Sequence, residues 1–121
     1  MPYNLRRVER ERKRVCWPAW VKAVEEWEKK IKEKIAKYRN LTKNALKEIR
    51  IAELNEKQKK LASEFIDFAK RYFEDAKYFE EKGLLLESLA ALSYAHAWLD
   101  AGIKAGLLEG RNPKLFAGLE E

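Results

Sequence analysis

The chain has 121 residues, of which 46% are hydrophobic and 38% are charged, with a formal net charge of +6 and a single cysteine. This length suits one domain, and a charged fraction so far above the usual quarter is typical of long helices with solvated faces and of thermophilic proteins. The single Cys16 excludes an intramolecular disulfide, and no apolar run approaches the ~18 residues of a transmembrane helix. We therefore expect a cytoplasmic protein.

Charge is divided unevenly along the chain. Residues 1–60 carry 19 Lys and Arg against 9 Asp and Glu, a net +10, whereas residues 61–121 carry 7 against 11, a net −4. An acidic partner is therefore expected to meet the N-terminal half. Residues 1–16 are predicted to form a basic arm whose six cations are candidates for nucleic-acid contact: Arg6, Arg7, Arg10, Arg12, Lys13 and Arg14.

A long first helix is predicted over residues 18–50. Pro18 suits the first turn of a helix. Apolar residues then recur at steps of three, four or seven, which is typical of one buried helix face. They are Trp20, Val24, Trp27, Ile31, Ile35, Tyr38, Thr42, Ala45 and Ile49.

The second helix is predicted over residues 56–82. Asn55 is a suitable N-cap, and Gln58 three residues later completes a capping box. Gly83 suits the C-terminal end of this helix. The third helix, over residues 85–107, is apolar on nearly every side, which is typical of a buried helix.

Short connections favour antiparallel neighbours, so the expected fold is all-α, an antiparallel three-helix bundle over residues 17–110. No strand is predicted. In residues 111–121, Asn112-Pro113 indicates the start of a short C-terminal helix. The first helix is the longest, so its first two turns are expected to extend past the bundle. Trp17 and Trp20 are expected on this extension, and together with Trp27 they are a candidate oligomer interface.

Two segments carry a family resemblance. Residues 72–83 read YFEDAKYFEEKG, and residues 89–102 read LAALSYAHAWLDAG. Together they resemble an archaeal helical family known as domain of unknown function 357, over about residues 50–108. That family usually has a polar residue, often Asp, directly after the glycine, where this chain has Leu84. The resemblance implies the helical fold and an archaeal origin, and it implies no activity.

The polar members of these segments allow two interpretations. Tyr72, Asp75, Tyr94 and Asp100 are predicted to form a network of hydrogen bonds between the second and third helices, because buried polar groups must be paired. Alternatively, His96 and Asp100, four residues apart on one helix face, hold a metal with a third ligand from Asp75 or Glu87. We favour the network and predict neither a metal nor a cofactor.

Familiar enzyme signatures are missing from the sequence, including a glycine-rich phosphate loop, Cys-x-x-Cys and His-Glu-x-x-His. Catalysis at Cys16, whose thiol lies near several cations, lacks a histidine partner. We therefore expect a non-enzymatic protein-interaction module that binds itself, as a homodimer through the start of the first helix or through the third helix, or another protein. The alternative is an accessory protein that binds RNA or DNA through the basic arm, with an affinity that falls with salt. A membrane partner is not expected.

Overall fold

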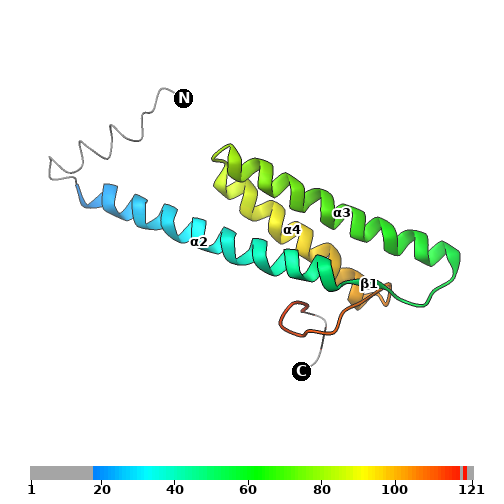
Figure 1. The fold of residues 1–121 in the computed structure, drawn as a ribbon. Helices are drawn as coiled ribbons and strands as arrows, with labels where there is room; N and C mark the ends of the chain where they lie inside the picture. The colour runs from blue at the N-terminus through cyan, green and yellow to red at the C-terminus, as the bar shows by residue number, and fades with distance from the viewer. Residues whose placement is uncertain (1–17, 118, 120–121) are drawn as a thin grey trace. The chain divides into compact units, whose positions relative to one another are not determined.

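The computed structural model describes residues 18–117 and 119, and in this part most of the chain is helical (Figure 1). This confirms the predicted all-α class. None of the described helices is long and apolar enough to cross a membrane. The basic arm, Cys16 and Trp17 lie outside the described residues. The elements in chain order are α2 (Ala19–Glu48), β1 (Arg50–Ile51), α3 (Glu56–Glu81), α4 (Leu85–Lys104) and β2 (Leu108–Glu109).

Helix α3 begins at Glu56, as predicted, and ends at Glu81, one residue before the predicted position. The Asn55 side chain accepts a hydrogen bond from the Gln58 backbone N–H at 2.9 Å, and the Gln58 side chain accepts one from the Asn55 N–H, which completes the capping box. At the other end Gly83 has φ +76°, a conformation that glycine adopts without strain.

The turn at Gly83 brings α4 back antiparallel to α3. Ser88, which is fully buried in the first turn of α4, donates a hydrogen bond to the Ala76 carbonyl at 2.7 Å. This bond ties the start of α4 to α3. Helix α4 ends three residues before the predicted position, before Gly106, which also has a positive φ.

The core of residues 31–121 lies between the three helices and contains two clusters. One cluster joins α2 to the parts of α3 and α4 nearest their turn. The other lies nearer β2 and the tail and includes Phe116. The buried members of the first are Ile31, Ile35, Phe73, Ala76, Ala91, Leu92 and Ala95, and those of the second are Ala45, Ala62, Ala69, Leu99, Leu107, Leu108 and Phe116.

Helix α2 is continuous, but burial divides it. Every fully buried side chain of α2 lies at or after Ile31, while Trp20, Val24 and Trp27 are exposed. The chain divides into two units between Lys30 and Ile31.

The chain that follows α2 and the chain that follows α4 form a strand pair that was not predicted. Residues Arg50 and Ile51 pair antiparallel with Glu109 and Leu108, so this short pair joins the segment after α2 to the segment after α4. Gly102 makes room for the approach, because an added Cβ there would collide with the Leu108 side chain.

The predicted C-terminal helix is wrong for the described part of the tail, where residues 113–115 form a turn. Asn112 does cap this turn, since its side chain accepts from the Lys114 N–H at 2.9 Å. The tail backbone bonds both within the turn and to α4: the Leu115 N–H donates to the Asn112 carbonyl at 3.0 Å, the Leu115 carbonyl contacts His96, and the Ala117 N–H donates to Asp100. The bonds to α4 replace those that a helix would form.

Candidate functional site

His96 links three segments of the protein. Its Nδ1 lies 3.1 Å from the Thr42 hydroxyl of α2, and its Nε2 lies 2.5 Å from the Leu115 carbonyl oxygen in the tail. A carbonyl can only accept, so Nε2 carries the proton, and in the neutral ring Nδ1 accepts from Thr42. Thr42 is almost completely buried. The imidazole therefore holds α2, α4 and the tail together.

Asp100 also contacts the tail. Its Oδ1 accepts from the Ala117 N–H at 3.0 Å and lies 3.8 Å from His96 Nε2. Asp75 and Glu87, the other carboxylates considered as ligands, are both exposed. Among residues 18–117 and 119, no group of three His, Cys, Asp or Glu side chains could hold a metal ion.

Of the four residues predicted to form a hydrogen-bonded network, the structure brings two into contact. Tyr72 of α3 and Tyr94 of α4 pack edge to face, with ring centroids 4.4 Å apart. Asp100 faces the tail, and Asp75 lies on the exposed side of α3. The contact between the tyrosines is therefore aromatic packing.

An aromatic row continues from these tyrosines along α3 and α4. Trp98 stacks on Phe68 at a centroid distance of 4.7 Å, and Phe65 and Tyr94 meet the Trp98 ring edge to face at 5.1 and 6.0 Å. Trp98 Nε1 is buried without a hydrogen-bond partner. Phe68 and Tyr94 remain partly exposed, so this row reaches the surface.

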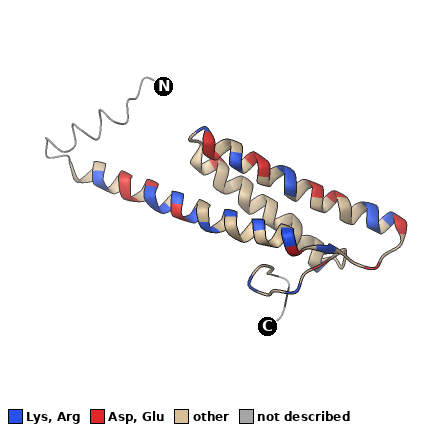
Figure 2. Ribbon diagram, in the orientation of Figure 1, with Lys and Arg blue, Asp and Glu red and all other residues tan. Residues whose placement is uncertain are grey.

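The outer face of α4 is apolar and exposed. Figure 2 shows that α4 is mostly uncharged along its length, whereas α2 and α3 carry alternating basic and acidic residues. Leu86 is 56% exposed and Tyr94 is 49% exposed. The expectation that α4 is buried on every side is therefore wrong, because only one of its faces is covered. We define the outer face of α4 by its exposed neutral residues: Leu86, Ala90, Ser93, Tyr94, Ala97 and Ala101.

The tryptophans of the predicted interface that the structure describes lie near the start of α2. Trp20 is 69% exposed and Trp27 is 59% exposed, with Val24 exposed between them. These spacings of three and four residues place the three side chains on one face of the helix. Two separate apolar surfaces thus exist, one on residues 19–30 and one on α4.

The comparisons with known proteins concern the helical core. Residues 37–108 match the model of the family described as Protein of unknown function DUF357, which covers more than half of the chain. The chain therefore belongs to this family, as its motifs indicated. A crystal structure of protein AF1782 from Archaeoglobus fulgidus, of the same family, is similar, with a TM-score of 0.59 and 25% identity over 70% of this chain and 99% of the other. No protein with a curated description matches.

The departure from the family pattern at Leu84 has a structural interpretation. Leu84 is the N-cap residue of α4, and its side chain makes no capping hydrogen bond. A polar residue such as Asp at this position would cap the helix. Leu84 therefore leaves the first turn of α4 without a side-chain cap.

Proposed function

We propose that this protein works by binding rather than by catalysis, as a protein-interaction module that self-associates through the outer face of α4. The proposal rests on one observation: the outer face of α4 is exposed, and its exposed side chains are uncharged between Glu87 and Lys104. Between Glu87 and Lys104 its exposed side chains are alanine, serine and tyrosine. Contiguous exposed apolar surface of this kind often marks a protein interface.

The shape of the face favours another helix as its occupant. Leu86 and Tyr94 project from a stripe that otherwise contains small residues: Ala90, Ala97 and Ala101. Small residues let a second helix approach closely, and the stripe from Leu86 to Ala101 extends over about 22 Å. In an antiparallel copy, Tyr94 meets the alanines on the C-terminal side of the stripe, so large side chains face small ones.

Charge favours a second copy in the antiparallel orientation. Glu87 lies near the N-terminal end of α4, and Lys104 lies at its C-terminal end. An antiparallel copy brings the Glu87 end of one chain to the Lys104 end of the other, where opposite charges attract. A parallel copy would bring like charges together. The aromatic row of α3 and α4 borders this contact and adds Phe68 to the apolar area.

The non-catalytic part of the proposal is supported by the role of the single histidine. Both ring nitrogens of His96 contact protein atoms that hold the fold together. A general base needs a nitrogen free to reach a substrate. The location we propose is the cytoplasm, where a single free cysteine is ordinary.

The experiment is light scattering on the full chain over a range of concentrations, with two matched variants. Ala97→Arg places a cation at the centre of the outer face, and Asn44→Arg adds the same charge at an exposed neutral position on α2. We expect a particle of twice the 14.3 kDa chain mass for the unaltered chain and for Asn44→Arg. Ala97→Arg should raise the dimer dissociation constant by about tenfold or more, since it buries an unpaired charge.

A third variant, Trp20→Asp, separates the two apolar surfaces. If the outer face of α4 is the contact, Trp20→Asp leaves the mass at that of a dimer. A monomer at high micromolar concentration for the unaltered chain contradicts the proposal. Dissociation by Trp20→Asp together with an intact Ala97→Arg dimer also contradicts it, because the contact then lies at the start of α2.

A further inference from the structure

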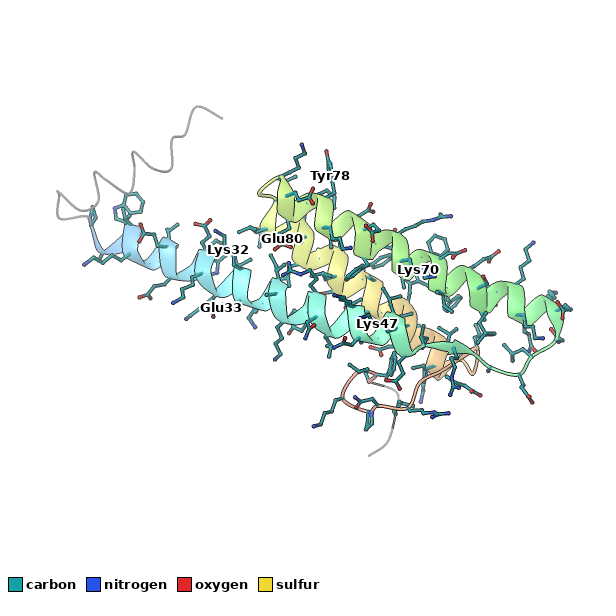
Figure 3. All side chains as sticks on the ribbon, viewed as in Figure 1. Lys32, Glu33, Lys47, Lys70, Tyr78 and Glu80 are labelled. Atoms are coloured by element: carbon teal, nitrogen blue, oxygen red, sulfur yellow. The ribbon has the colours of Figure 1, made fainter. Side chains whose placement is uncertain are left out.

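A basic groove runs between α2 and α3. Its lining comes from both helices and includes no residue of α4. Its charged residues are Arg39, Lys43 and Lys47 from α2 and Lys70, Lys77 and one carboxylate, Glu74, from α3. Lys47 and Lys70 are labelled on the two sides of this groove in Figure 3.

The cations of the groove differ in how they are neutralised. Arg39 is paired with Glu80, and Lys77 lies 3.3 Å from Glu74. For Lys43, Lys47 and Lys70, no carboxylate of the described residues lies within ion-pair distance. Three lysines on two facing helices therefore present positive charge to whatever enters the groove.

The part of α2 that lines the groove is predominantly basic. Residues 31–48 contain six Lys or Arg and two Glu. Three of the six, Arg39, Lys43 and Lys47, follow one another at intervals of four residues, so they form a row along one helix face. A row of cations of this kind raises the local concentration of anions and favours a linear polyanion over a compact one.

The dimensions fit a nucleic-acid backbone. From Arg39 to Lys47 the row extends over about 12 Å, which is the length of three to four phosphates at the 3.4 Å spacing of one strand of a duplex. The floor of the groove is Phe73, which is only 7% exposed and shows little ring surface for stacking. Contacts to phosphates without contacts to bases give sequence-independent binding.

We propose that the groove between α2 and α3 is a nucleic-acid site that holds the phosphate backbone through Lys43, Lys47 and Lys70. Arg39, fixed by Glu80, extends the row at one end. The site is independent of the proposed self-association, because its residues lie away from the outer face of α4. It also differs from the predicted arm, since all its lysines lie within α2 and α3.

The test uses fluorescence anisotropy with two probes, a labelled 20-nucleotide oligouridine RNA and a labelled 20-base-pair DNA duplex. The full chain is compared with the triple variant Lys43→Ala/Lys47→Ala/Lys70→Ala. The matched control is Lys30→Ala/Lys34→Ala/Lys37→Ala, which removes the same charge from exposed positions on the opposite side of α2. All variants keep the basic arm, so the arm contributes equally.

For the groove variant we expect the dissociation constant for the RNA at 50 mM salt to rise by about tenfold or more. The slope of log K against log salt should fall by about 2, since each lost phosphate contact on a single strand removes about 0.7. The control should weaken binding by no more than about threefold. Tighter binding of one probe identifies the strand type that the groove accepts and supports the site.

Three results would overturn the inference: no binding of either probe by the unaltered chain, an unchanged affinity in the groove variant, or an equal loss in the control. Circular dichroism at the same temperature verifies that each variant is folded. This check is decisive because the three lysines are exposed, so their removal leaves the core intact.

Discussion

Helices α2 and α4 both pack against the same core, yet their outer surfaces differ in kind. From Ile31 to Glu48, α2 buries an apolar stripe and presents lysine and glutamate to solvent. Helix α4 buries Leu92, Ala95 and Leu99 on one face and presents Leu86, Ala97 and Tyr94 on the other. The outer face of α2 is suited to water and to anions, whereas that of α4 is suited to another apolar surface.

This difference teaches how a uniformly apolar helix should be interpreted in a small bundle. Two neighbouring helices cover only part of a third, and the remainder is exposed unless another element or another chain covers it. Apolar character on all sides therefore predicts the need for a partner as well as burial. The following predictions test the contrast between the helices, beginning with the largest expected effect.

The first prediction compares a leucine-to-alanine substitution on the buried face of α4 with one on its exposed face. Leu99→Ala, at a fully buried position, should lower the free energy of unfolding by about 2–5 kcal/mol, because it removes apolar contacts and leaves a cavity. Leu86→Ala, at the exposed face, should cost less than about 0.5 kcal/mol in the monomer. Urea denaturation at a concentration below dimerisation measures both. Equal losses would mean that the outer face is covered within the monomer.

The second prediction concerns the bond that joins α4 to α2. Thr42→Val keeps the shape of the side chain but leaves His96 Nδ1 without its donor, so the free energy of unfolding should fall by about 1–3 kcal/mol. A double-mutant cycle with His96→Ala gives the coupling between the two side chains. Independent effects in that cycle would show that the bond does not contribute to stability.

The third prediction restores the missing cap of α4. Leu84→Asp should raise the free energy of unfolding by about 0.5–2 kcal/mol, because its carboxylate accepts from the first turn and interacts favourably with the helix dipole. Leu84→Asn supplies the same cap without the charge. If neither variant is more stable than the unaltered chain in thermal denaturation, the capping interpretation fails.

The smallest effect is expected for the ion pair between α2 and α3. Arg39 and Glu80 are both about one-third exposed, and solvent screens pairs of this kind. Arg39→Met should therefore cost about 0.2–1 kcal/mol and should cost less at high salt. A loss above 3 kcal/mol would indicate a pair that behaves as buried.

The helices could be predicted from the sequence because their signals are local. The capping box at Asn55 and the glycine at position 83 mark the ends of α3 correctly, and the apolar period identifies the buried residues of α2 from Ile31 onward. The strand pair could not be predicted, since two-residue strands have no periodicity and Ile51 meets Leu108 from a distant part of the chain. The turn at Asn112 was mistaken for a helix start because its competing partners, His96 and Asp100, lie on α4.

The candidate surfaces were predicted less well than the fold. The motif suggested that Asp75 joins Asp100 and the tyrosines in a network between α3 and α4, although the helical period already places Asp75 away from the buried Phe73, on the outside of α3. The groove lysines were counted in the overall charge but not placed, because their convergence depends on how α2 packs against α3. Which side of α4 remains exposed also depends on how the three helices pack together.

The most direct measurement of the central claim is cysteine cross-linking at the centre of the outer face. In a Cys16→Ser background, Ala97→Cys and Asn44→Cys each provide one exposed thiol on a different helix. Antiparallel α4 helices bring the two Ala97 positions close to the twofold axis, within the short reach of a disulfide. The account predicts rapid oxidation of Ala97→Cys to a covalent dimer and slow oxidation of Asn44→Cys. Equal rates for the two variants would contradict it.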